Sequence, residues 1–218
     1  MRPMKDSGVE WLGEVPEGWE VLPAGAVFRS SSKKGAESEV HLTPSQKHGV
    51  LSQKDYMSVS GSRVVLQNSD SGNMKFVLPG DFISHLRSFQ GGLELSLLRG
   101  KVSGAYTVLR PVRKQSSGYF KWLLKCSQYI QGLQTTTDQL RDGQNIRMEQ
   151  LRLLKLPFPH LGEQTSIAAF LDQETSQIDV LVEKARRGIE LLKERRQALI
   201  TQAVTGKIDV RGFDGGNS

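Results

Sequence analysis

The chain has 218 residues, 37% of them apolar, which is enough to bury one core and carry an extension. Its one cysteine, Cys126, excludes an internal disulfide, and no apolar run approaches the length of about 18 residues that a membrane helix needs. Residues 1–6 lack the apolar segment of a secretory signal, so we expect a soluble, cytoplasmic protein.

The net charge of +6 is unevenly distributed along the chain. Residues 40–160 hold sixteen Lys and Arg against seven Asp and Glu, a net charge of +9. Residues 1–39 carry a net charge of −2, and residues 161–218 carry −1. Cations that cluster without compensating acids are typical of a surface that contacts phosphates, so the middle region favours nucleic acid as a partner.

The first two thirds of the chain predict a β-rich domain. Residues 1–22 are expected to form an irregular lead-in whose tryptophans, Trp11 and Trp19, anchor it to the core. Short apolar runs separated by turn residues predict strands at 64–66, 75–78, 81–84 and 106–110. The apolar spacing then changes to that of one helix over 118–133, followed by a loop over 135–145. The tail after Arg211 is expected to be disordered.

One uninterrupted helical pattern runs from about Gly162 to Thr205. At a rise of 1.5 Å per residue such a helix is roughly 65 Å long, more than a domain of this size can cover. Apolar residues recur every seven positions on one side, with Lys, Arg and Glu on the other, which is typical of a coiled coil. The predicted self-association stripe contains Ile167, Leu171, Ile178, Leu181, Ala185, Ile189, Leu192 and Leu199, flanked by Val182 and Ala203.

The heptad residues are centred on Ala185, with the small Gly188 one turn further. If two copies pack antiparallel about a twofold axis there, Leu171 of one lies near Leu199 of the other, and Ile178 lies near Leu192. The alternative is that the stripe packs on other helices of its own complex. A glycine inside a helix costs about 1 kcal/mol relative to alanine, which favours a packing reason for Gly188.

The sequence offers no catalytic site. Its four histidines are scattered without a metal-ligand spacing, and it has neither a Walker loop nor a glycine-rich dinucleotide motif. Asp81 and Glu94 could suggest a nuclease, but Ser96 stands where such a site needs a lysine, so the two carboxylates are expected to be salt-bridge partners. There is also no Asn-Pro-Pro-aromatic or Asp-Pro-Pro-aromatic tetrad for a base-modifying methyltransferase. We expect a protein that is not an enzyme.

Several motifs occur together in one order: residues 6–20, 84–93, 102–111, the block Leu140-Arg-Asp-Gly-Gln-Asn-Ile-Arg147, residues 163–172 and the ending Thr205-Gly-Lys-Ile-Asp-Val210. In these blocks the chain resembles the specificity (S) subunits of type I restriction–modification systems. The resemblance implies an α+β protein with a β-rich target-recognition domain over 1–160, a long coiled-coil helix over 161–205 and a short tail over 206–218. Family members usually carry two such domains and two such helices, which form an antiparallel coiled coil, so this chain resembles either a natural half-length subunit or a truncated fragment. The symmetric stripe predicts that such a half is made whole by homodimerisation.

The resemblance also implies the partners. The S subunit reads double-stranded DNA, while modification subunits bind S-adenosylmethionine and methylate adenine, and ATP-dependent restriction subunits can join them. No cofactor is expected in this chain itself. Two domains separated by about 65 Å of helix would touch grooves roughly two DNA turns apart, which predicts a bipartite site whose halves are inverted copies.

Candidate DNA contacts follow from side-chain chemistry, with solvated surface charge as the alternative for each. Phosphate contacts are expected from Lys33, Lys34, Lys54, Lys75, Lys101, Arg113 and Lys114. Base edges suit Asn73, Arg87, Gln90, Arg141, Gln144 and Asn145, although the blocks around Arg87 and Arg141 recur in relatives of different specificity. Variable specificity is expected between Ser45 and Asn73, around Gln46, Lys47, His48, Lys54, Tyr56, Arg63, Gln67 and Asn68.

Two other functions stay open from the sequence. One is the recognition part of a fused DNA-modifying or restriction enzyme, which would need a catalytic module. The other is a coiled-coil protein that binds DNA without reading its sequence. Equal affinities for matched and scrambled duplexes would indicate the latter.

Overall fold

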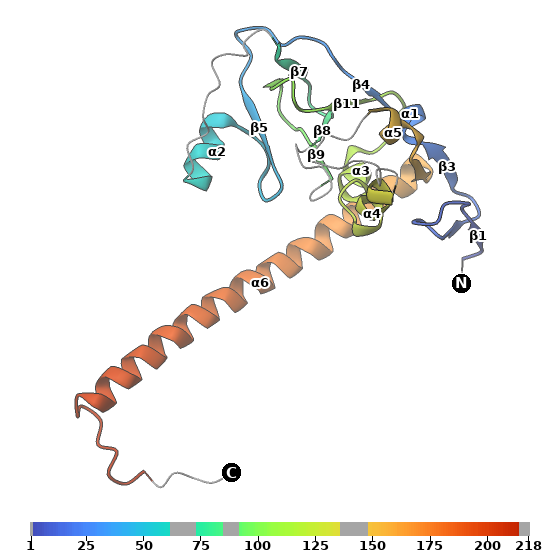
Figure 1. Cartoon of the computed structure of the whole chain (residues 1–218). Coiled ribbons are helices and arrows are strands. Elements are labelled where there is room, and N and C mark those ends of the chain that lie inside the picture. Colours follow the sequence, from blue (N-terminus) through green and yellow to red (C-terminus); the bar gives the residue numbers. More distant parts are fainter. Residues whose placement is uncertain (1, 62–72, 85–91, 136–147, 214–218) are drawn as a thin grey trace. The chain divides into compact units, whose positions relative to one another are not determined.

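The computed structural model describes residues 2–61, 73–84, 92–135 and 148–213 (Figure 1). By its internal contacts the chain divides into two compact units, Met1–Ala169 and Phe170–Ser218. The boundary lies inside the long C-terminal helix, whose first turns belong to the first unit. The functional division predicted above, 1–160, 161–205 and 206–218, stays a prediction.

The N-terminal segment is a hairpin. Strand β1 (Met4–Asp6) pairs antiparallel with β2 (Glu14–Pro16), and Ser7 N donates to Gly13 O over 3.0 Å at the start of the connection. The half-buried ring of Trp11 packs edge-on against Tyr129, with centroids 6.1 Å apart. The prediction of an irregular lead-in is therefore wrong, whereas the anchoring of Trp11 to the core is confirmed.

A four-stranded antiparallel sheet forms the centre of the first unit, in the order β4-β11-β8-β9. Its strands are Phe28–Ser30, Val108–Pro111, Phe82–Ser84 and Leu93–Leu95. The strands predicted at 81–84 and 106–110 correspond to β8 and β11, shifted by one or two residues. The predicted strand at 75–78 is β7 (Lys75–Val77), and the one at 64–66 lies outside the described residues.

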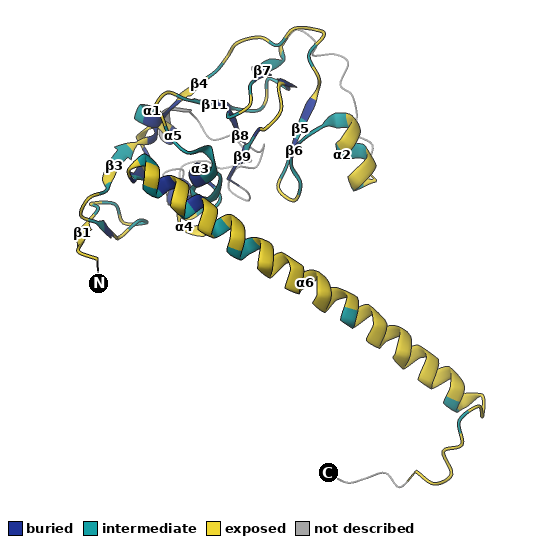
Figure 2. Cartoon of the chain, turned by 180° about the vertical axis from the view of Figure 1, so that it is seen from behind, coloured by how far each residue is buried: buried dark blue, intermediate teal, exposed yellow. Residues whose placement is uncertain are grey.

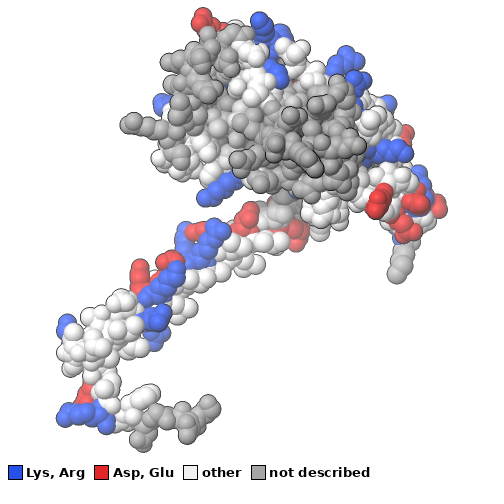
Figure 3. All heavy atoms as spheres, in the orientation of Figure 1, with Lys and Arg blue, Asp and Glu red and all other residues white. Residues whose placement is uncertain are grey.

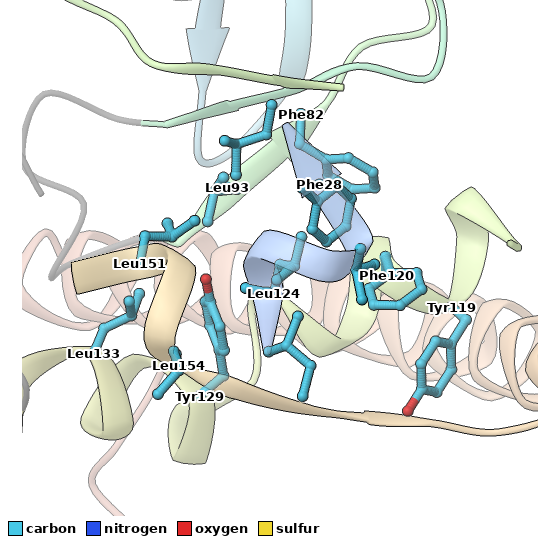
Figure 4. Packing of buried hydrophobic residues seen from close by; sticks show 14 of the residues in the cluster. Phe28, Phe82, Leu93, Tyr119, Phe120, Leu124, Tyr129, Leu133, Leu151 and Leu154 are labelled. Carbon is cyan, nitrogen blue, oxygen red and sulfur yellow. The ribbon is translucent and has the colours of Figure 1, made fainter. Parts of the chain in front are cut away.

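Side chains alternate across this sheet, so each face covers a different core. Phe82 and Leu109 enter the larger core. Four helices also contribute to this core: α1 (Ala24–Val27), α3 (Ser117–Leu123), α4 (Ser127–Thr135) and α5 (Met148–Leu153). Strand β12 (Lys155–Phe158) completes it and pairs with β3 (Glu20–Pro23). In Figure 4 the rings of Phe28, Phe82 and Phe120 turn toward one another, and Phe28 meets the other two edge-on at 5.4 and 5.2 Å.

Ile83 and Val108 point into the smaller core on the other face, with Leu42, Val50, Val77 and Val102. The elements on this side are the hairpin β5 (Leu42–Ser45) and β6 (Gly49–Ser52), α2 (Gln53–Ser60), β7 and β10 (Gly100–Val102). Figures 1 and 2 show β5 and α2 on the side of the sheet away from α1, α3 and α5.

The helix predicted over 118–133 is two helices, α3 and α4, because the backbone of Leu124 has a partner elsewhere. Leu124 O accepts a hydrogen bond from Leu93 N over 3.3 Å, at the start of β9. A Cβ at Gly92, whose φ is +68°, would lie 2.0 Å from the same carbonyl oxygen. This close approach to the sheet ends α3 and requires glycine at position 92.

Helix α6 runs from Leu161 to Val204, which confirms the predicted long helix. Its 44 residues correspond to about 66 Å. Gly206, with φ of +73°, follows the helix, and Lys207 N donates to Gln202 O over 2.8 Å. Figure 2 shows that most of α6 is exposed along its length. Among the helices that the structure describes, none is long and apolar enough to span a membrane.

Candidate nucleic-acid interface

Two lysine-bearing segments lie side by side at the smaller core. The segment around Lys33 and Lys34 runs antiparallel to β7, where Lys34 pairs with Lys75. Phe76 N donates to Lys33 O over 2.7 Å, and Gly35 N donates to Met74 O over 3.0 Å. The backbone pairing therefore brings together three of the lysines predicted to contact phosphates.

Phe76 gathers the charges of this region around one ring. Lys33 Nζ and Arg99 Cζ each lie 5.2 Å from its centroid, and the residue is only 7% exposed. Cations over an aromatic face are attracted by its quadrupole, so the ring positions both side chains. We call Lys33, Lys34, Lys75 and Arg99 the Phe76 cluster. Figure 3 shows Lys and Arg side chains along the upper edge of the first unit.

Arg99 was not among the predicted contacts. No local signal marks it, because Arg99 lies just before β10 and its place in the cluster depends on the distant ring of Phe76. Its guanidinium pairs with Glu39, with Arg99 Nη2 2.7 Å from Glu39 Oε1. The hydrogen bond lowers the pKa of the Glu39 carboxyl and raises the pKa of Arg99. Glu39 thus offsets one of the four cations, and the cluster keeps a positive balance.

Lys75 is the most enclosed member of the cluster. Its Nζ donates to Tyr106 O over 2.7 Å, and burial lowers the pKa of its ammonium. Tyr106 packs against the smaller core, and burial raises the pKa of its phenol. Lys75 therefore adds charge at a fixed point, whereas Lys33 and Lys34 are exposed.

Lys101 does not join the cluster, in contrast to the expectation. It is 4% exposed, and its Nζ donates to Glu37 O over 2.7 Å and to Ala36 O over 3.2 Å. Its stem packs so closely on Gly35 that a Cβ there would lie 2.7 Å from Lys101 Cβ. Because its ammonium is buried and occupied by backbone carbonyls, we remove Lys101 from the proposed phosphate contacts.

The β5–β6 hairpin presents part of the segment predicted to vary with specificity. Gln46 and Lys47 are exposed at its tip, and His48, which is half-buried, donates its backbone N–H to Ser45 Oγ over 3.2 Å. The hairpin continues into α2, whose N-terminus is capped by Ser52. Helix α2 carries the exposed Lys54 and the half-buried Tyr56. Lys101 N donates to Val40 O over 2.8 Å just before β5, so β10 joins the hairpin to β7 and to the Phe76 cluster.

The remaining predicted contacts lie elsewhere. Arg113 and Lys114 are exposed after β11, and Arg113 Nε donates to Ala26 O over 3.0 Å. Because β4 and β11 are antiparallel, these two residues and Lys33 lie at opposite ends of that strand pair. Asn73 is exposed and lies against Gly104. Outside the described residues lie Arg63, Gln67, Asn68, Arg87, Gln90, Arg141, Gln144 and Asn145.

The two carboxylates that could have suggested a nuclease are both ion-paired. Asp81 is 2% exposed and accepts from Arg110 Nη2 over 2.6 Å and from Leu78 N over 2.8 Å. Glu94, equally buried, lies 2.5 Å from Lys125 Nζ. The prediction that they are salt-bridge partners is confirmed. No His, Cys, Asp and Glu group suited to a metal ion occurs among the residues that the structure describes.

Most of the predicted self-association stripe is exposed. The accessible fractions of Ile178, Leu181, Ile189, Leu192 and Leu199 lie between 52% and 65%, and Ala185 is exposed as well. Ile167 and Leu171 are partly covered, and Ile167 packs against the larger core. A row of large apolar side chains in water costs free energy that a partner helix would recover.

Comparison with known proteins adds an independent finding. Residues 16–190 match the model of the type I restriction modification DNA specificity domain. The chain belongs to this family. The specificity subunit of the type I restriction enzyme StySPI from Salmonella potsdam is 25% identical over 217 residues, covering 90% of this chain and 44% of the relative. The EcoKI specificity subunit of Escherichia coli K12 is 32% identical over 101 residues, covering 46% of this chain and 22% of that protein.

Two solved structures share the fold of this specificity-domain protein. One comes from work on complex assembly and conformational transition of the type I R-M system, with a TM-score of 0.60, and the other is the HsdS subunit from Thermoanaerobacter tengcongensis, with 0.54. Both are 19% identical to this chain in sequence. The matches cover 87% and 89% of this chain, respectively, and 46% of each solved chain. The chain thus spans about half the length of these relatives. The predicted α+β class, with a β-rich part followed by one long helix, is confirmed.

Proposed function

We propose that this chain is the DNA sequence-specificity subunit of a type I restriction–modification enzyme and acts as a homodimer that reads a bipartite, inverted-repeat site. One copy would contribute one target-recognition domain, and α6 would hold two such domains apart. The observation that carries the proposal is the presence, in one chain of this family, of an exposed cluster of cations and an exposed apolar stripe on a helix of about 66 Å.

DNA binding rests on the Phe76 cluster and the β5–β6 hairpin. Lys33, Lys34 and Arg99 offer charge for phosphates, while Gln46 and His48 on the hairpin offer donors and acceptors for base edges. Such a division, with cations positioning the duplex and a protruding hairpin reading it, is how proteins separate affinity from specificity. Arg113, Lys114, Lys54 and the undescribed candidates stay proposals for peripheral contacts.

The proposed partners follow from the family. The chain would dock modification subunits that bind S-adenosylmethionine and methylate adenine, and restriction subunits could join the same assembly. Its own role would be to select the site and position these proteins, without catalysis. Because a helix of about 66 Å corresponds to roughly two turns of DNA, the two half-sites would lie on one face of the duplex.

DNA binding is tested by equilibrium titration of the purified chain. The duplexes are a library-selected sequence and its scrambled version, across 50–300 mM salt. We expect a specificity ratio of about 10³ or more, with affinity for both duplexes falling steeply as salt rises. Equal affinities for the two would instead indicate a sequence-independent DNA-binding protein.

A second experiment separates the subunit from a self-contained enzyme. Incubation of the chain alone with S-adenosylmethionine and the selected duplex should transfer no methyl group, and addition of the cognate modification subunit should restore transfer. Methyl transfer by the chain alone would overturn the proposal that it is non-catalytic.

A further inference from the structure

The two halves of helix α6 carry opposite net charges, in addition to the apolar and charged faces of the helix. Between residues 170 and 184 it carries Asp172, Glu174, Asp179 and Glu183 against one lysine, a net charge of −3. Between residues 186 and 200 it carries five Lys and Arg against two glutamates, a net charge of +3. The change of sign falls at Ala185, the residue on which the apolar heptads are centred. An antiparallel copy would therefore place each acidic half beside a basic half.

Two of these charges lie on the apolar side of the helix, which corrects the assignment of all charged residues to the other side. With 3.6 residues per turn, Glu174 lies about five turns before Leu192, and Arg196 lies about five turns after Ile178. Both charged residues are thus in line with stripe residues, whereas Glu183, Arg187, Glu190 and Lys193 form local pairs elsewhere on the helix. Neither Glu174 nor Arg196 forms an ion pair with another residue that the structure describes.

We propose that Glu174 of one copy pairs with Arg196 of a second copy, and that these two symmetry-related ion pairs fix the antiparallel orientation and register of the α6 homodimer. A twofold axis at Ala185 relates positions equally distant from it, and Glu174 and Arg196 are each eleven residues away. The same axis sets Ile178 against Leu192 and Leu171 against Leu199. This inference rests on the proposed homodimer and names the contacts that select its geometry.

The opposite orientation is disfavoured by the same residues. In a parallel pair, Glu174 would face Glu174 and Arg196 would face Arg196, and each half of the helix would meet its own sign of charge. Repulsion between like charges at the flanks of an apolar seam is a common device for selecting the orientation of a coiled coil. The partner that fits this face is therefore a helix with the reversed charge order, which a second copy supplies.

The test is charge reversal, measured as the dimer dissociation constant by sedimentation over a concentration series. Glu174→Arg or Arg196→Glu turns both attractive pairs of the antiparallel dimer into repulsive ones and should weaken it by about ten- to a hundredfold. The double reversal Glu174→Arg with Arg196→Glu restores opposite charges and should return the constant to within about threefold of the unmodified chain. High salt should reduce the differences in dissociation constant between the variants and the unmodified chain, because exposed ion pairs are screened.

Glu194→Arg is the matched control. It makes the same chemical change two residues after Leu192, about 200° around the helix, and should leave the dissociation constant unchanged. An unmodified chain that stays monomeric would overturn the proposed homodimer and this inference with it. A dimer that tolerates Glu174→Arg, or is not restored by the double reversal, would overturn the register alone and leave the proposed function standing.

Discussion

The indole nitrogen of Trp19 donates a hydrogen bond to the Glu163 carboxylate over 2.9 Å, joining the N-terminal segment to the first turn of α6. Arg2 binds the same carboxylate through its two terminal guanidinium nitrogens, and its Cζ lies 5.7 Å from the centroid of the Trp19 ring. One acidic side chain thus fixes the start of the long helix to residues more than 140 positions earlier in the chain. A carboxylate at a helix N-terminus also faces the positive end of the helix dipole.

The Glu163 carboxylate should make the unfolding free energy depend on pH in the acidic range. The Arg2 guanidinium, with help from the indole, holds the pKa of Glu163 below its usual range. A lowered pKa means that the stabilisation is present above the unfolded value, about 4.3, and is lost as the pH falls through the folded value. We expect Glu163→Gln to cost roughly 1 kcal/mol at pH 7 and to flatten the fall in unfolding free energy between pH 5 and 3.

Urea unfolding at several pH values measures this effect. Glu10→Gln is the control, because Glu10 is exposed and should leave the profile unchanged. A Glu163→Gln profile that runs parallel to that of the unmodified chain would contradict the role given to this carboxylate.

The side-chain amide of Gln164 should be required for the stability of the first unit. It is fully buried, its Nε2 donates to Pro159 O over 2.8 Å, and its Oε1 accepts from Ser116 N over 2.9 Å. Gln164→Leu would leave the part-buried N–H of Ser116 and the buried carbonyl of Pro159 unpaired, at a cost of about 2–4 kcal/mol of unfolding free energy. Denaturant titration measures this loss. Thr165→Ala, which removes one exposed bond within α6, should cost under about 1 kcal/mol, and equal losses for the two would reject the argument.

Local pattern was sufficient for some elements. The helical spacing after Gly162 predicted α6 to within one residue at each end, because a long amphipathic pattern needs no tertiary information. The short apolar runs likewise located β7, β8 and β11. Trp11 was placed in the core by its size alone, and the pairing of Asp81 and Glu94 with cations followed from their position in a basic domain.

Long-range contacts account for what the sequence did not predict. Leu124 ends α3 because its carbonyl bonds to Leu93, and β12 forms because it pairs with β3 across more than 130 residues. Lys101 was expected at the surface from its charge, yet the missing side chain of Gly35 leaves room for its stem, and its ammonium donates to two backbone carbonyls. Arg99 was missed because its relevance depends on Phe76, 23 positions earlier. None of these depends on the residues next in sequence.

Substitution of Lys34 should weaken DNA binding, whereas substitution of Lys101 should lower stability. Lys34 is exposed in the Phe76 cluster, so Lys34→Met should weaken binding to matched and scrambled duplexes alike and lower the salt slope by about 1. Lys101→Met should lower the unfolding free energy by about 1–3 kcal/mol, because two carbonyls lose their donor. At temperatures where both variants are folded, Lys101→Met should keep the unmodified salt slope.

Salt titrations by fluorescence anisotropy and denaturant unfolding provide the two readouts. A reduced salt slope for Lys101→Met would return this lysine to the set of phosphate contacts. An unchanged slope for Lys34→Met would indicate that the cluster is only a solvated surface.

The exposed part of the apolar stripe, from Ile178 to Leu199, should govern self-association, while the first unit folds without it. Ile178→Asp with Leu192→Asp sets four carboxylates against one another across the proposed twofold axis and removes the burial of four large side chains. Each such side chain contributes about 1.5–3 kcal/mol when fully buried, so the variant should be a monomer at all concentrations accessible to sedimentation. Val180→Asp is the control, because Val180 is an exposed apolar side chain about 160° around the helix from Ile178. The control should remain dimeric, and near-ultraviolet circular dichroism should show the packed aromatic core of the first unit in both variants. Dimers that survive Ile178→Asp with Leu192→Asp but are lost with the control would move the interface to the other face of α6.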